Sequence, residues 1–184
     1  MINIDSIMMK RWDTLDKEID YKNERFYITK ERFITPRNTE GLYYVLHSNP
    51  GVKIVALDGD DVIFIKEYRY PVKKYIFELP GGGVEKNEKL EYTGNRELSE
   101  EVGYKSADMR YMGKIDVLPA VSDSICHVFL AYDLEETSRN LDDTEFDSEV
   151  VRINKNEVYK MLDLGEFENP LTASVLLKVR KYVL

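Results

Sequence analysis

Cysteine is nearly absent from this chain of 184 residues, in which Cys126 is the single cysteine. One cysteine cannot form a disulfide bond within the chain, and this composition is typical of a reducing compartment, so we expect a cytoplasmic protein. The residues around Cys126 are apolar and β-prone, as at Ile125 and residues 128–130. This pattern predicts a buried, unreactive thiol.

Long apolar runs are also missing, and basic residues are in the minority. Charged side chains interrupt the first 18 residues, which are therefore expected to form neither a signal peptide nor a transmembrane span. The 26 Lys and Arg residues face 34 Asp and Glu residues, which gives a formal net charge of −8. Nucleic acids and anionic membranes are bound through basic patches, so we expect neither as a partner.

The length suits one ordinary domain with a small appendage. β-prone segments at residues 26–29, 33–35 and 41–46 precede a turn at Asn49-Pro50-Gly51. We therefore expect a small N-terminal antiparallel β-strand subdomain over residues 1–48 and a larger domain over residues 49–184. Residues 1–20 are compatible with either a short helix or an extended lead-in.

The larger domain shows strand patterns interrupted by helical ones, which predicts an α+β fold, a mixed α/β/α sandwich. An acidic turn around Gly59 joins two apolar strands into a hairpin. Asn154 and Asn169 suit the starts of two C-terminal helices, with Pro170 in the first turn of the second. The remaining strands are expected at residues 75–79, 109–117, 124–134 and 150–153.

Three glutamates give the chain its clearest chemical signal. Glu97, Glu100 and Glu101 are spaced i, i+3 and i+4, so a helix places them on one face. Asn87 suits the N-cap of that helix and Gly103 its C-terminal stop. Like charges on one face repel each other unless a cation neutralises them, and oxygen-only ligands suit Mg²⁺, or alternatively Mn²⁺.

The pattern around these glutamates resembles the Nudix box, the signature of the Nudix hydrolases. A glycine-rich loop at residues 79–83 precedes it, and its fixed positions are all occupied, namely Gly82, Glu88, Arg96-Glu97-Leu98-x-Glu100-Glu101-x-Gly103. The resemblance implies a Nudix fold, with the carbonyl of Gly81 as a further metal ligand and Arg96 orienting the glutamates. Two positions depart from the family's pattern, Tyr104 for an aliphatic residue and Gly94 inside the helix.

Segments outside the box resemble the ADP-ribose pyrophosphatase branch of the family. They read Glu67-Tyr68-Arg69-Tyr70-Pro71 and Glu78-Leu79-Pro80-Gly81-Gly82. By this resemblance Arg69 contacts the substrate's phosphate or sugar, although pairing with a surface carboxylate would also explain it. Glu78 either receives a substrate group or caps the glycine loop. The N-terminal strands are implied to form a homodimer and to help hold the base, the alternative being a monomer.

The resemblance implies Mg²⁺-dependent hydrolysis of a nucleoside diphosphate sugar, with ADP-ribose as the first substrate to consider. Metal-bound glutamates neutralise the diphosphate, and a remaining carboxylate, Glu100 or Glu101, takes a proton from water. The branch often uses a glutamate on a later loop as the base, and Glu145 and Glu149 fit about equally well. GDP-mannose is an alternative substrate, and a second alternative is a non-catalytic sensor of nucleotide sugars.

Overall fold

The computed structural model describes residues 10–141 and 147–184. The described chain separates into two compact units. The first contains the residues up to Ser48 together with Leu118–Ser124, and the second contains Asn49–Val117 and Ile125–Leu184. The segment Leu118–Ser124, which the sequence places inside the larger domain, therefore makes its contacts within the N-terminal unit.

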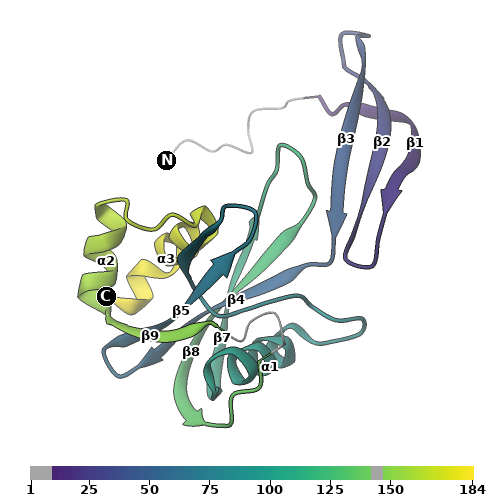
Figure 1. Ribbon diagram of the computed structural model, residues 1–184. Coiled ribbons are helices and arrows are strands. Elements are labelled where there is room, and N and C mark those ends of the chain that lie inside the picture. Colours follow the sequence, from purple (N-terminus) through teal and green to yellow (C-terminus); the bar gives the residue numbers. More distant parts are fainter. Residues whose placement is uncertain (1–9, 142–146) are drawn as a thin grey trace. The chain divides into compact units, whose positions relative to one another are not determined.

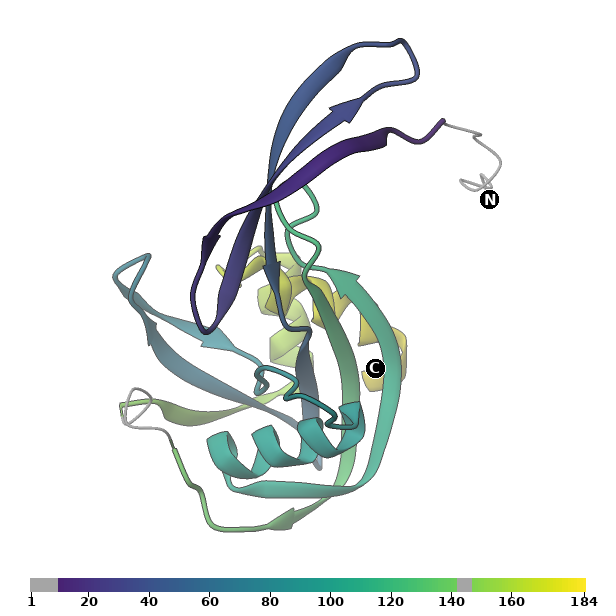
Figure 2. The same ribbon diagram turned by 90° about the vertical axis from the view of Figure 1, so that its right-hand side faces the viewer.

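The first unit is an antiparallel sheet in the order β1-β2-β3, labelled in Figure 1 and turned by 90° in Figure 2. Its strands are β1 (Asp13–Lys22), β2 (Phe26–Ile34) and β3 (Glu40–Ser48). The undecided N-terminal stretch thus contains a strand, and every residue of β1 is exposed, which is why no apolar alternation revealed it. Ion pairs to β2 accompany the backbone pairing, including Lys17–Glu31 at 2.8 Å and Arg32–Asp16 at 2.9 Å.

The segment Leu118–Ser124 is tied to the end of β3. The amide of Leu46 donates to the carbonyl of Val121 at 2.8 Å, and the hydroxyl of Ser122 donates to the carbonyl of Leu46 at 2.8 Å. The Nδ1 atom of His47 lies 2.6 Å from a carboxylate oxygen of Asp123. Backbone and side-chain bonds together thus make this segment part of the N-terminal unit.

The second unit is built on a mixed sheet in the order β6-β5-β4-β8-β7, with β9 pairing with β5. Strands β4 and β8 run parallel, and the other paired strands run antiparallel. The strands are β4 (Gly51–Asp58), β5 (Asp61–Arg69), β6 (Lys74–Glu78), β7 (Tyr104–Asp116), β8 (Ile125–Glu136) and β9 (Glu149–Asn154). The hairpin predicted around Gly59 is confirmed as β4 and β5.

Helices cover both faces of this sheet, as the α/β/α prediction requires (Figure 1). Helix α1 (Leu90–Val102) buries Leu98 against one face, while α2 (Lys155–Asp163) and α3 (Pro170–Val183) cover the other. Strand β4 contributes to both layers, because Ile54 packs on the α1 side and Val55 on the α3 side. In the part of the chain that the structure describes, no helix is long and apolar enough to cross a membrane.

Helix α1 begins later than the sequence predicts. The N-cap position belongs to Lys89, and Asn87 instead has a φ of 68° in the turn before it. The turn forms because the amide of Glu88 donates to the carbonyl of Glu85 and the Glu88 carboxylate accepts from Thr93. The predicted stop is confirmed, since Gly103 has a left-handed φ of 74° and its amide caps the helix.

The buried state predicted for Cys126 is also confirmed. Its residue surface is 3% exposed in strand β8, and it has no disulfide partner among the described residues. Burial raises the pKa of the Cys126 thiol to about 11, which keeps it protonated and unreactive at neutral pH.

Two neighbouring leucines of α3 test which face of this helix packs against the sheet. Leu176 is fully buried in the core, whereas Leu177 is 58% exposed. We expect Leu176→Ala to lower the free energy of unfolding by about 2–5 kcal/mol, because it leaves a cavity. The matched control Leu177→Ala should change it by less than about 0.5 kcal/mol. Urea denaturation of the two variants measures both values, and equal losses would contradict the packing described.

Candidate active site

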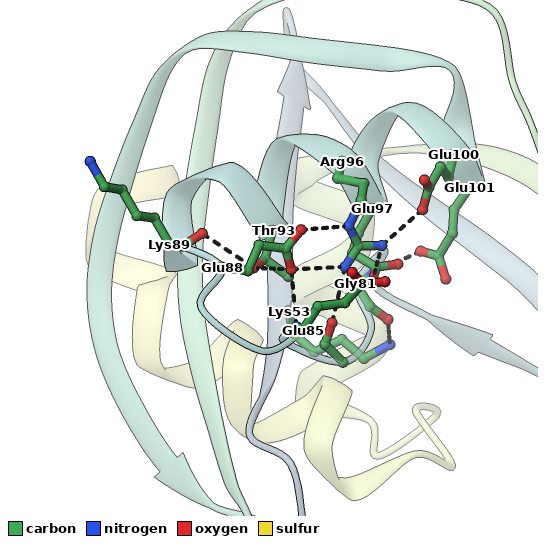
Figure 3. Close-up of polar contacts among 11 residues, drawn as sticks. Lys53, Gly81, Glu85, Glu88, Lys89, Thr93, Arg96, Glu97, Glu100 and Glu101 are labelled. Carbon is green, nitrogen blue, oxygen red and sulfur yellow. Dashed lines mark hydrogen bonds and ion pairs between the residues drawn. The ribbon is translucent and has the colours of Figure 1, made fainter. Parts of the chain in front are cut away.

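Glu97, Glu100 and Glu101 of α1 line a cleft of about 410 Å³ beside the glycine-rich loop (Figure 3). Glu97 and Glu101 are largely buried, and Glu100 is the more exposed of the three. The residues that line the cleft come from β4, β5, β6, the glycine-rich loop, α1 and the segment after β8, and they are Lys53, Arg69, Glu78, Gly81, Gly82, Gly83, Arg96, Glu97, Glu100, Glu101 and Asn140. The predicted helix face and the predicted loop therefore meet at one concave site.

A larger cavity of about 510 Å³ lies along a neighbouring side of α1. It shares Arg96 and Glu100 with the acidic cleft but contains neither Glu97 nor Glu101. The chemistry of clustered carboxylates is therefore concentrated in the smaller cleft.

Arg96 holds the acidic cluster together. Its Nη1 atom lies 2.9 Å from an oxygen of Glu97 and 2.9 Å from an oxygen of Glu100. Its Nε donates to Glu88 at 2.8 Å, and its Nη2 donates to the carbonyl of Gly83 at 3.0 Å. The hydrogen bond from Arg96 lowers the pKa of Glu88 to about 2, and the carboxylates in turn raise the pKa of Arg96.

The glycine-rich loop is fixed on the backbone of β4. The amide of Val52 donates to the carbonyl of Gly82 at 2.9 Å, and the amide of Ile54 donates to the carbonyl of Pro80 at 2.9 Å. Gly81 has a φ of 141°, and a Cβ atom there would overlap the carbonyl oxygen of Val52. Only glycine therefore fits this close approach.

The same loop positions two of the glutamates. The amide of Gly81 donates to the carboxylate of Glu101 at 2.7 Å. A Cβ atom on Gly82 would lie 2.6 Å from Oε1 of Glu97, so the Glu97 carboxylate rests against bare backbone. Gly81 and Gly82 thus determine where the carboxylate oxygens of Glu101 and Glu97 lie.

Arg69 and Glu78 form a two-pronged ion pair at the wall of the cleft. The Nε and Nη2 atoms of Arg69 donate to the two carboxylate oxygens of Glu78 at 2.6 and 2.8 Å, and Glu67 lies 3.0 Å from Nη2. Burial alone would raise the pKa of Glu78, but the charges of Arg69 and Lys53 outweigh it and lower the pKa to about 2. Glu78 is therefore an ionised anchor for Arg69, which is the more exposed partner.

The two loop glutamates predicted as candidate bases are not both described. Glu145 lies outside the described residues. Glu149 begins strand β9 opposite Lys66, is exposed, and is not among the residues that line the cleft.

Two residues of the cleft carry no prediction from the sequence. Lys53 is buried in β4 and lines the cleft. A lysine in a largely apolar strand segment was the one feature of the sequence that could have pointed to it. Asn140 follows β8, and its amide donates to the carbonyl of Glu100 at 3.1 Å. Arg139 next to it donates to the carbonyl of Glu101 and to Ser148, which ties this segment to the end of α1. These contacts join residues that are distant in sequence, so no local sequence motif predicts them.

The carboxylate oxygens of the cleft are the type of ligand that a hard divalent cation such as Mg²⁺ prefers. As the side chains lie, no three acidic, histidine or cysteine groups within residues 10–141 and 147–184 converge closely enough to hold a metal ion. Arg96 lies between Glu97 and Glu100, and the amide of Gly81 bonds Glu101. A cation would therefore take over contacts that the guanidinium makes with these carboxylates.

Comparison with known proteins agrees with the site. The family model described as NUDIX domain matches residues 47–173, which include the whole cleft. The chain belongs to the Nudix hydrolase family. The box that the sequence predicts is thus part of a complete Nudix domain, and the chain is a hydrolase of this family.

Individual relatives place the chain within this family. It is 34% identical to the ADP-ribose pyrophosphatase of Bacillus subtilis (strain 168) over 131 residues, which cover 70% of each chain. It is 26% identical to the ADP compounds hydrolase NudE of Escherichia coli (strain K12), over 100% of this chain and 92% of the relative. A crystal structure of an ADP compounds hydrolase matches with a TM-score of 0.85 at 24% identity and covers 95% of each chain, which shows the Nudix fold. The resemblance to the ADP-ribose pyrophosphatase branch is confirmed.

The Glu88–Arg96 ion pair predicts how stability depends on pH. The pKa of Glu88 is lower in the folded chain than in the unfolded one, where it is about 4.3, so the stabilisation is complete above that pH and is lost as the pH falls toward about 2. Arg96→Met should lower the free energy of unfolding at pH 7 by about 1–3 kcal/mol, because it leaves carboxylates without their donor. It should also flatten the loss of stability between pH 5 and pH 3.

Urea denaturation at pH 3, 4, 5 and 7 measures this dependence. Lys86→Met, at an exposed position of the adjoining turn, is the matched control and should keep the wild-type slope. Parallel pH profiles for Arg96→Met and the wild type would show that Arg96 does not control the ionisation of Glu88.

Proposed function

We propose that this Nudix hydrolase cleaves the pyrophosphate bond of a nucleoside diphosphate sugar with Mg²⁺, and that ADP-ribose is converted to AMP and ribose 5-phosphate. The observation that carries the proposal is a single cleft with Glu97, Glu100 and Glu101 on one wall and the guanidinium of Arg69 on another. This arrangement combines metal-binding oxygens with a group that binds phosphate. The names of the relatives, an ADP-ribose pyrophosphatase and an ADP compounds hydrolase, support this choice of substrate.

Glu97, Glu100 and Glu101 would hold Mg²⁺, or alternatively Mn²⁺. When bound, the ion supplies positive charge to the diphosphate oxygens and lowers the pKa of a coordinated water. The glycine-rich loop keeps Glu101 and Glu97 in place, and Arg96 limits the repulsion between Glu97 and Glu100. The carbonyl oxygen of Gly81 would be a further metal ligand; it lies 3.3 Å from the ammonium of Lys53, while the Gly81 amide bonds Glu101.

Arg69 is the group that we assign to the phosphate or the terminal sugar of the substrate. Its pairing with Glu78 fixes the plane of the guanidinium and leaves the side chain 39% exposed at the cleft. Glu78 acts by holding Arg69. For proton transfer we assign Glu100, which is the most exposed glutamate of the cluster, with Glu101 as the alternative.

Release of AMP from ADP-ribose in the presence of Mg²⁺ tests the assignment. We expect turnover by the wild type and a loss of about 10²–10⁴-fold in kcat for Glu101→Gln, because the amide cannot replace the carboxylate charge. Glu91→Gln, on the exposed first turn of α1, is the matched control and should retain activity. GDP-mannose and other nucleotide sugars, assayed in parallel, identify the preferred base and sugar.

A preference for GDP-mannose would keep the reaction class and change the substrate. Tight binding of one nucleotide sugar without turnover would contradict the enzyme and favour a sensor. The intact set of box glutamates favours the enzyme, because a sensor has no need of them.

We also propose a cytoplasmic homodimer formed through the N-terminal strands. A three-stranded sheet with little buried apolar surface is marginally stable by itself, and partner surfaces commonly cover such sheets. Large apolar side chains are exposed in the N-terminal unit at Trp12, Leu15, Ile19, Tyr21, Leu42, Tyr43 and Tyr44. These side chains are aromatic or aliphatic, and this composition suits the centre of an interface and, by its aromatic rings, contact with a base.

Sedimentation equilibrium tests the dimer. Ile19→Asp should weaken the association at least about tenfold, because it places a charge among the apolar side chains of β1. Leu177→Asp, the same kind of change at an exposed leucine of α3, is the matched control and should sediment as the wild type. A wild-type monomer at micromolar concentration would refute the proposal.

A further inference from the structure

Lys53 is a buried lysine whose charge the proposed mechanism does not use. It is 7% exposed and lies in β4 between two residues, Val52 and Ile54, whose amides bond the glycine-rich loop. The backbone on both sides of Lys53 is therefore fixed to that loop, and the position of its side chain is restricted accordingly. Burying an ammonium group is costly unless oxygen atoms of the protein replace its water.

The oxygens that replace this water belong to the cleft. Nζ of Lys53 donates to the carbonyl of Leu79 at 2.8 Å, to the carbonyl of Gly81 at 3.3 Å and to the carboxylate of Glu78 at 3.3 Å. An ammonium group has three protons to donate, so these acceptors match its full capacity. Figure 3 shows Lys53 beside Gly81, next to the glutamates of α1.

The charges that line the cleft are closely balanced. Three side chains are basic, and four are acidic, namely Glu78, Glu97, Glu100 and Glu101. Removing the charge of Lys53 would leave twice as many acidic as basic groups. Coulomb interactions are stronger in such a partly buried site than in water, so one fixed charge has a large effect on a divalent ion.

We propose that Lys53 is a built-in cation of the cleft, which engages the carbonyl oxygen of Gly81 and limits how tightly the site binds a divalent metal ion. This inference rests on the proposed function, because it assumes that a divalent ion binds beside the box glutamates. Lys53 is a positioning residue: it acts through the Gly81 carbonyl, the Glu78 carboxylate and the local charge. The carbonyl of Gly81, which the family resemblance offers as a metal ligand, is directed to lysine in this chain.

A purely structural role for Lys53 predicts the opposite effect. If the ammonium group only braces the glycine-rich loop, its removal loosens the loop that holds Glu101 and weakens metal binding. If it competes with the metal ion, its removal strengthens metal binding. The direction of the change in affinity therefore separates the two roles.

Binding of Mn²⁺ to the substrate-free protein, followed by electron paramagnetic resonance of the free ion, provides this measurement. We expect Lys53→Met and Lys53→Gln to lower the Kd for Mn²⁺ at least about tenfold relative to the wild type. The glutamine amide can still donate to the loop carbonyls, so this variant carries the test if the methionine variant does not fold. Lys178→Met, an exposed lysine of α3 outside the cleft, is the matched control and should keep the wild-type Kd.

An unchanged or higher Kd in variants with native circular dichroism would overturn the proposal. If that occurs while the wild type hydrolyses ADP-ribose with Mg²⁺, the proposed function stands and only the role of Lys53 fails. If neither the wild type nor the variants bind Mn²⁺ and none hydrolyses a nucleotide sugar, both proposals fail.

Discussion

Electrostatic repulsion between closely spaced carboxylates is the constraint on which this structure depends. A helix that carries Glu97, Glu100 and Glu101 on one side would be unfavourable without compensating positive charge. The chain provides that charge through Arg96, which bonds the cluster and reaches back to Glu88 and Gly83. The local stability of the box therefore depends on how this repulsion between carboxylates is neutralised.

The sheet gives this charged helix a rigid support. Strand β4 is buried on both faces, so the glycine-rich loop bonded to its backbone rests on a well-enclosed strand of the unit. The amide of Gly81 then bonds a glutamate of α1. A short series of backbone contacts thus connects the core to the carboxylates, and tight packing of the core limits their movement.

Local patterns were enough to predict the box helix, its stop at Gly103 and the hairpin at Gly59, because these depend on residues close in sequence. Strand β1 could not be predicted, since all of its residues are exposed and its support comes from β2. The start of α1 was misplaced because Glu88 bonds Arg96, eight residues away, instead of continuing the helix. Lys53 meets its acceptors more than twenty residues along the chain, a separation that no local motif records.

The segment Leu118–Ser124 has a consequence for the modularity of the protein. It is an excursion of the larger unit's chain, between β7 and β8, that completes the N-terminal unit by bonding Leu46 and His47. Recombination at the turn after Ser48 would separate β3 from this segment and leave polar groups on both sides without partners. The N-terminal sheet is therefore not a self-contained module of the first 48 residues, because part of its unit is encoded between β7 and β8.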